Sequence, residues 1–177
     1  MKKRLSILLS LMLLMAWTGN AQTAKYTLTP KGIGNIKVGA KMRTIPSEMP
    51  PLYTSVSNFG DEWTFTTDCK NDKDETIFSV ISGADDNLEY EDLPIKTILV
   101  ISPGVSTAEG FSVGSTCEQL LKGGGKKKSI VFFDDKANFV ELGGLFYFFD
   151  RNGGFGQVIA PEDKVVLITN NSRFFEF

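Results

Sequence analysis

The stretch "NFVELGGLFYFFD", residues 138–150, sets the expected architecture of the chain. It holds two runs rich in aromatic and β-branched residues, 138–142 and 145–150, which are typical of β-strands. Between them stand Gly143 and Gly144, the two-glycine connection of a tight β-hairpin. The stretch therefore predicts two antiparallel strands and, with them, a sheet.

The second run is apolar on both of its faces. Phe146 and Phe148 lie on one face, and Tyr147 and Phe149 lie on the other. This pattern favours a central strand packed on both sides, and the alternative is that one face is exposed as a binding surface. On that alternative, Trp63, Tyr147 and Phe149 are the candidate binding residues.

Outward from this hairpin the chain predicts further strands and two short helices. The strands are expected at 25–29, 62–67, 76–82, 95–102, 129–134 and 164–169. One helix is expected in "STCEQLLKGGG", with Ser115 as N-cap and Glu118 completing a capping box, and a weaker one in "GAKMRTIPSEM". The predicted fold class is α+β, a mostly antiparallel sheet with two short helices.

The two helix candidates follow related stretches, "GNIKVGAKMRTI" from Gly34 and "GFSVGSTCEQLL" from Gly110. The repeat motif consists of the pairs Val38-Gly39 and Val113-Gly114, which align with a shift of 75 residues. We therefore predict two repeated strand-turn-helix-strands units, with halves at 25–94 and 95–177. The alternative is chance similarity between short windows rich in Gly and Val.

The openings "IGNIKVGAKM" and "AEGFSVGSTC" resemble the entry to the first helix in small exported bacterial envelope proteins of the SmpA/BamE type. They are also similar to the β-lactamase inhibitory proteins, which duplicate a comparable unit. The resemblance implies an antiparallel sheet with helices on one face and a role in protein–protein contact. It points to an uncharacterised family and carries over no functional residue.

The start of the chain predicts export. Lys2, Lys3 and Arg4 precede an apolar run from Leu5 to Trp17, which is too short for a membrane span, and small residues follow it. We expect residues 1–21 to be a cleaved signal peptide and residues 22–177 to form one secreted domain, periplasmic or extracellular. No transmembrane segment is expected in the mature chain.

Composition excludes several classes of function. Removal of the signal would leave 16 basic and 21 acidic residues, a net charge of −5 that disfavours a nucleic-acid partner. The chain has no histidine, so it can form neither a Ser-His-Asp triad nor a zinc site with an imidazole ligand. No cofactor and no metal is predicted.

The two cysteines, Cys69 and Cys117, form a candidate disulfide, as expected for an exported chain. Two inert buried thiols are the main alternative. A reactive Cys117 at the start of a helix is a third reading, but it lacks a histidine to accept its proton.

The run "GGGKKK", residues 123–128, fails as a Walker phosphate loop because Lys127 stands where Ser or Thr is needed. We interpret it as a helix stop followed by a solvated turn, with an anion site as the alternative.

The leading functional prediction is a non-enzymatic exported module that binds a protein or another envelope component. The alternative is a carboxylate-based hydrolase acting on glycans or cell-envelope material. Its acidic pair would come from Asp61, Glu62, Asp134, Asp135 and Glu141.

Overall fold

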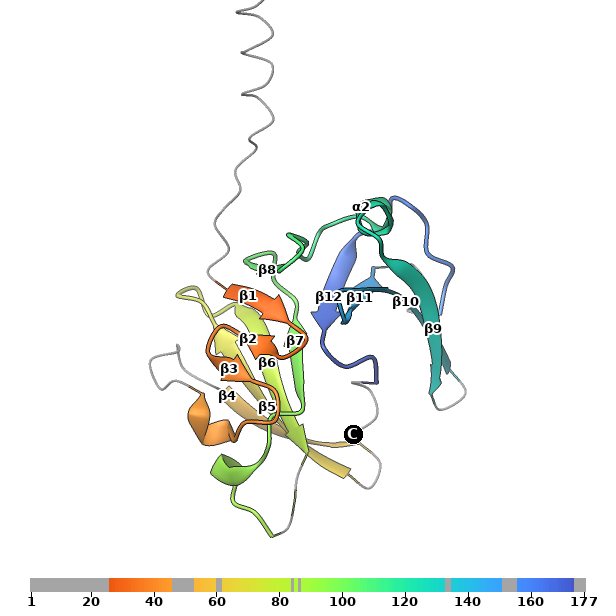
Figure 1. Ribbon diagram of the computed structural model, residues 1–177. Helices are drawn as coiled ribbons and strands as arrows, with labels where there is room; N and C mark the ends of the chain where they lie inside the picture. The colour runs from red at the N-terminus through yellow and green to blue at the C-terminus, as the bar shows by residue number, and fades with distance from the viewer. Residues whose placement is uncertain are drawn as a thin grey trace, which may run out of the picture.

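Two β-sheets make up most of the regular structure (Figure 1). The computed structural model describes residues 26–45, 53–59, 62–83, 85, 87–132, 135–150 and 156–173. The small sheet has the order β3-β2-β1-β8 and the large sheet the order β4-β5-β6-β7-β12-β11-β10-β9. The strands of the small sheet are β1 (Tyr26–Thr29), β2 (Gly32–Ile33), β3 (Ile36–Lys37) and β8 (Val105–Thr107). Those of the large sheet are β4 (Tyr53–Phe59), β5 (Glu62–Lys70), β6 (Thr76–Gly83), β7 (Thr97–Val100), β9 (Lys126–Phe132), β10 (Asp135–Leu142), β11 (Leu145–Phe149) and β12 (Val165–Thr169).

The main core lies between the small sheet and one face of the large sheet. Leu28, Ile33 and Ile36 of the small sheet are buried in the same cluster as Phe78 of β6. The ring of Tyr26 packs edge-on against Phe78, with 5.4 Å between ring centroids. A second cluster on the opposite face of the large sheet contains Phe139 and Phe148 with their neighbours Ala137 and Leu167. The large sheet is therefore apolar on both faces, as expected of interior strands.

The predicted α+β class with two helices is wrong, because the described residues contain one short α-helix and are mostly β. The helix expected in "GAKMRTIPSEM" is only a turn of 3₁₀ helix, η1 (Met42–Thr44). Its N-cap residue Lys41 makes no side-chain cap, and the Met42 N–H donates to the Leu93 carbonyl in another segment. Pro46, which follows shortly, would lack the N–H that a longer helix needs. No described helix is both long and apolar enough to cross a membrane.

The one described α-helix, α2 (Cys117–Lys122), begins one residue later than predicted. Thr116, not Ser115, is the N-cap: its hydroxyl accepts the Gln119 N–H at 3.3 Å, and the Gln119 side chain accepts the Thr116 N–H at 2.8 Å. The Ser115 hydroxyl does not cap the helix, because it accepts the Ser112 N–H at 3.1 Å instead. Glu118 therefore lies in the first turn, where it forms an ion pair with Lys122 instead of closing a capping box. Gly123 ends the helix, as predicted.

The two halves of the chain hold their glycine turns with the same backbone hydrogen bonds. In each half, three backbone groups of the turn bond to one later segment. The glycine N–H donates to that segment, the carbonyl of the next residue accepts from it, and the N–H of the third residue after the glycine donates to it. In the first half these bonds are Gly39 N–H to Ile95 O (2.7 Å), Ile95 N–H to Ala40 O (2.8 Å) and Met42 N–H to Leu93 O (2.9 Å). In the second half they are Gly114 N–H to Val165 O (2.8 Å), Val165 N–H to Ser115 O (2.8 Å) and Cys117 N–H to Asp163 O (2.9 Å).

The large sheet repeats this correspondence in its strand order. From either edge inward the strands follow the order of the sequence, β4 to β7 on one side and β9 to β12 on the other. The two halves meet where β7 pairs with β12, at Leu99 opposite Thr169. Both turn glycines have positive φ, +84° at Gly39 and +93° at Gly114. The origin of the halves by duplication stays a prediction, and the matched turns supply a residue-by-residue correspondence between them.

Candidate ligand-binding site

The second aromatic run is packed on both faces, as the favoured interpretation expected, and the alternative of an exposed binding surface does not hold for Tyr147 and Phe149. Tyr147 is 0% exposed and Phe149 is 1% exposed, and both belong to the main core. The reason is the position of β11, which lies between β10 and β12 and packs its odd-numbered residues against the small-sheet side. The side chain of Trp63 lies outside the described residues.

The structure does not form the predicted disulfide, since both Cys69 and Cys117 are buried and no bond joins their sulfurs, and the pairing stays a prediction. Cys69 lies in β5 opposite Phe78, whereas Cys117 opens α2 in the other half of the chain. Their exposed fractions are 1% and 0%, which argues against a reactive Cys117.

We expect neither thiol to react with an alkylating reagent in the native protein at neutral pH, and both to react in denaturant. Mass spectrometry of the two samples measures this directly. A sample in which no thiol reacts even in denaturant would restore the disulfide, and rapid native labelling of Cys117 would restore the reactive thiol.

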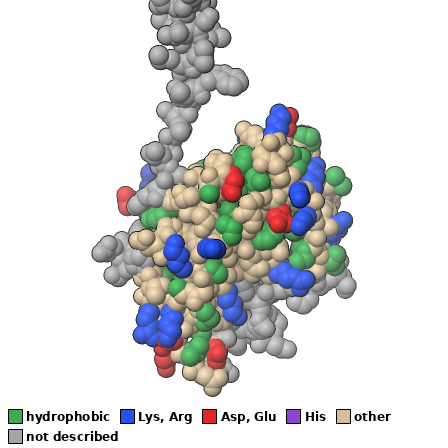
Figure 2. Space-filling model, in the orientation of Figure 1, with side chains coloured by type: hydrophobic (Ala, Val, Ile, Leu, Met, Phe, Trp, Pro, Cys, Tyr) green, Lys and Arg blue, Asp and Glu red, His purple; other side chains and the backbone are tan. Residues whose placement is uncertain are grey.

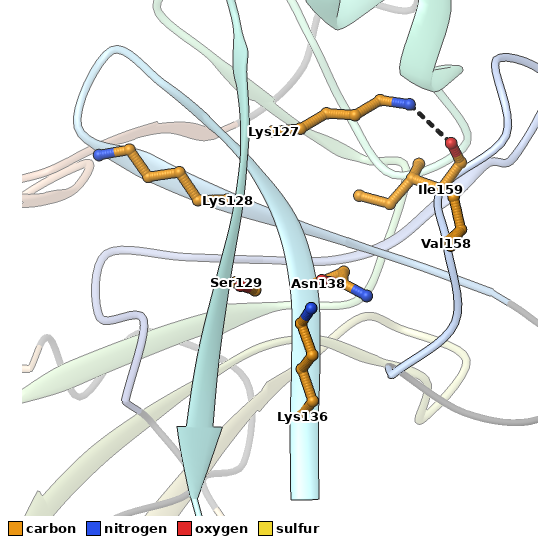
Figure 3. Close-up of a pocket in the computed structure, with 7 residues that line it drawn as sticks. All are labelled: Lys127, Lys128, Ser129, Lys136, Asn138, Val158 and Ile159. Atoms are coloured by element: carbon orange, nitrogen blue, oxygen red, sulfur yellow. Dashed lines mark hydrogen bonds between the residues drawn. The ribbon is translucent and has the colours of Figure 1, made fainter.

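The described part of the chain contains a hollow of about 280 Å³ beside the edge of the large sheet (Figure 3). We call it the lysine hollow; its lining residues are Lys127, Lys128 and Ser129 of β9, Lys136 and Asn138 of β10, and Val158 and Ile159. Within the hairpin, Ser129 lies opposite Asn138 and Lys127 opposite Val140, so these side chains share the face that carries the core residue Val140. The hollow therefore continues the core face outward, where polar residues replace apolar ones.

Two side chains fix the wall formed by residues 156–160. The Lys127 ammonium donates to the Ile159 carbonyl at 2.6 Å. The Asn138 amide donates to the carbonyls of Gly156 (2.8 Å) and Gln157 (2.9 Å). Ile159 is buried, whereas its neighbour Val158 is 87% exposed at the rim. The segment is thus held across the hairpin by hydrogen bonds that leave the hollow open on one side.

The three lysines differ in how their charge is compensated. Lys128 forms an ion pair with Glu141 and points away from Asn138 (Figure 3). Lys127 is bonded to a neutral carbonyl, and Lys136 forms no ion pair among the described residues. None of the described residues that line the hollow carries a carboxylate. Figure 2 shows several lysine or arginine side chains on the side of the molecule that carries β9 and β10, and others on the opposite side.

The first half of the chain fills the corresponding position with aromatic rings. The β4–β5 hairpin places residue 56 opposite Phe65 and residue 54 opposite Thr67, the same register that relates Ser129 to Asn138 and Lys127 to Val140. Phe65 is thus the counterpart of Asn138. The Tyr90 carbonyl accepts the Leu93 N–H just as the Ala160 carbonyl accepts the Asp163 N–H, so Tyr90 is the counterpart of Ala160.

These two counterparts pack together. The rings of Phe65 and Tyr90 are 5.5 Å apart between centroids, and the Tyr90 hydroxyl hydrogen-bonds with Thr67. In the second half Asn138 and Ala160 carry no ring, and the lysine hollow lies beside them. The hollow is therefore a local difference between halves that otherwise share their hydrogen-bonding pattern.

Sequence reasoning found only part of this site. It singled out "GGGKKK" but placed Lys126–Lys128 in a solvated turn, whereas they begin β9. It did not connect them with Lys136, Asn138 or the segment 156–160. The available signal was the alternation of Lys127 and Ser129 on one strand with Lys136 and Asn138 on the next, which places all four side chains on one face.

The carboxylates proposed for a hydrolase are not brought together by the described side chains. Only Glu141 of the five has a described side chain, and it is bound by Lys128. Asp61 and Asp134 lie outside the described residues, as do the side chains of Glu62 and Asp135. Within the described residues no group of three or more His, Cys, Asp or Glu side chains is placed to hold a metal ion.

The comparisons with known proteins establish a fold relationship. No family model and no curated protein matches the sequence. Among solved structures, the chain is similar to the crystal structure of the uncharacterized protein yfeY from Escherichia coli, with a TM-score of 0.58 and 14% sequence identity. The similarity covers 81% of this chain and 97% of that chain. At this identity it shows that the two proteins share a fold.

Proposed function

We propose that the protein is an exported, non-enzymatic binding module that takes its ligand in the lysine hollow. The N-terminal sequence supports export, since a basic start is followed by a short apolar run and small residues. The absence of histidine supports a binding role over the commonest forms of hydrolytic catalysis. An envelope component or a protein segment presented outside the cytoplasm is the expected class of partner.

One observation carries the proposal: the hollow lies where the other half of the chain packs Phe65 against Tyr90. Aromatic rings can thus occupy this position between a hairpin and the segment beside it, so the fold does not require an opening there. Ligand pockets commonly measure roughly 300–1,000 Å³. At about 280 Å³ the hollow is suited to one small chemical group rather than to a whole large molecule.

The test is to fill the hollow with the residues of the other half. We expect Asn138→Phe combined with Ala160→Tyr to abolish ligand binding while leaving the fold intact. The measurement is an NMR titration of isotope-labelled protein with a soluble cell-envelope extract, read at the amides of residues 127–129, 136–138 and 156–160. Leu121→Tyr is the matched control, because it adds a ring at an exposed position of α2.

Wild type and the control should show the same extract-induced shifts at these amides, and the filled variant should show none. The proposal fails if the extract leaves the hollow amides of the wild type unchanged. It also fails if the filled variant, verified as folded by circular dichroism, responds as the wild type does.

A further inference from the structure

We propose that the lysine hollow recognises a phosphate group, held by Lys127, Lys136 and Ser129. This inference rests on the proposed function and specifies the chemistry of its ligand. The starting observation is that the described lining of the hollow contains three lysines and no carboxylate, in a chain whose acidic residues outnumber its basic ones. Positive charge is therefore concentrated locally against the overall charge of the protein.

The uncompensated charge comes from two of the three lysines. The ammonium of Lys128 is neutralised by Glu141. The Lys127 ammonium uses one of its three hydrogens to bond the Ile159 carbonyl, and this neutral partner leaves the positive charge of Lys127 uncompensated. Lys136 is in no ion pair among the described residues and points toward Asn138 (Figure 3). Lys127 and Lys136 thus leave two uncompensated positive charges among the residues that line the hollow, which match a group that carries up to two negative charges.

The hydrogen-bond donors lead to the same chemistry. Within the part of the chain that the structure describes, two hydrogens of Lys127, three of Lys136 and the Ser129 hydroxyl remain for a ligand, whereas both amide hydrogens of Asn138 are bonded to Gly156 and Gln157. A phosphate group offers several oxygen acceptors at which such charge-assisted bonds form. Asn138 is a positioning residue, which holds the wall of the hollow and leaves recognition to its neighbours.

Protection of a sheet edge does not account for these lysines. Edge strands often carry lysine because its charge discourages pairing with another chain, and β9 is an edge strand. However, Lys136 belongs to β10, an interior strand, and the Lys127 ammonium is bonded across the hairpin instead of extending from the edge. An anion site accounts for both positions.

The experiment is an NMR titration with inorganic phosphate and with glycerol 3-phosphate, read at the same hollow amides, with the neutral disaccharide chitobiose as reference probe. Vesicles of phosphatidylcholine with and without phosphatidylglycerol form a second arm, read by cosedimentation. The variants are Lys127→Gln and Lys136→Gln. Lys128→Gln is the matched control, since it removes the same charge from the same hairpin but from an ammonium already paired with Glu141.

We expect both soluble phosphates, but not chitobiose, to shift the hollow amides, and added salt to weaken the binding. Lys127→Gln and Lys136→Gln should each lower the affinity about tenfold, the effect of losing one charge-assisted hydrogen bond. Lys128→Gln should change it less than about twofold, as for a screened surface charge. Cosedimentation that requires phosphatidylglycerol and is lost in Lys127→Gln would identify a lipid headgroup as the source, and binding to soluble phosphates alone would identify a free phosphate compound.

The inference is overturned if neither phosphate shifts the hollow amides at millimolar concentration. It is also overturned if the three lysine variants bind phosphate equally, because general surface charge would then explain the binding. If the envelope extract shifts these amides and phosphate does not, the proposed function stands and the phosphate assignment falls.

Discussion

Replacing Gly32 with alanine is expected to lower the free energy of unfolding by about 3 kcal/mol or more, the range in which backbone strain and overpacking combine. Gly32 lies in β2, where it pairs with Thr29 on one side and Lys37 on the other. Its φ is +152°, and an added Cβ would overlap the carbonyl oxygen of Ile36. Because both flanking strands fix this backbone, it cannot move aside without breaking the small sheet. Urea unfolding followed by circular dichroism measures the loss.

The matched control is Gly124→Ala, which separates strain from collision. Gly124 also has a positive φ, +94°, but an added Cβ would have nothing within 4 Å. Its substitution should cost about 1–2 kcal/mol, the ordinary penalty of a left-handed conformation. Equal losses in the two variants would contradict the packing assigned to Gly32.

The second large effect concerns the buried hydroxyl of Tyr147. Among the described residues it makes no hydrogen bond of good geometry. Burial raises the pKa of Tyr147 to about 12; the nearby Thr107 hydroxyl, too poorly placed for a full hydrogen bond, opposes this rise only weakly, and the negative charge of Glu109 adds to it. The native protein therefore keeps this proton to a higher pH than the unfolded chain, in which tyrosine ionises near 10. Stability from this group is complete below about pH 10 and is lost as pH rises to about 12, by about 2–3 kcal/mol.

We expect Tyr147→Phe to remove this alkaline loss. At neutral pH the variant should be at least as stable as the wild type, and by up to about 1 kcal/mol more stable, because an unpartnered buried hydroxyl is costly. Urea unfolding at pH 7 and pH 11 supplies the comparison, in which the other ionisable groups contribute equally to both proteins. Destabilisation of Tyr147→Phe at pH 7 would show that the hydroxyl is stabilising, and retention of the full alkaline loss would show that Tyr147 is not its source.

Long apolar strands were predictable from the sequence because each carries its own periodic signal. The strands expected at 25–29, 62–67, 76–82 and 95–102 correspond to β1, β5, β6 and β7, and the four later ones to β9–β12. Four strands were missed. Three of them, β2, β3 and β8, have only two or three residues, too few to show a period of two. The fourth, β4 (Tyr53–Phe59), has seven residues, but its sequence YTSVSNF mixes polar and apolar residues without a clear alternation. The three short strands exist because the chain around them is held by long-range hydrogen bonds, which no local window contains.

The errors in helix and site prediction share a cause. The pattern around Met42 suggests a helix, but the Met42 N–H bonds to Leu93, far away in the sequence. Lys127 likewise acquires its partner, the Ile159 carbonyl, from a segment 32 residues later. Tyr147 and Phe149 could be assigned to one strand face, yet which face the small sheet would cover depended on pairings such as that of β1 with β8. Local composition predicted the elements, and tertiary pairing decided their environment.

The mirrored order of the large sheet also gives this protein an internal standard for distinguishing packing from recognition. Positions in the β9–β10 hairpin have counterparts in the β4–β5 hairpin with the same pairing register, so a swap between these counterparts changes the side chain and keeps the strand pairing. Exchanging the two residues that pair where the halves meet, Leu99 and Thr169, should leave the fold unchanged. Sites where exchange alters only binding would then mark the residues that specialise one half of the molecule.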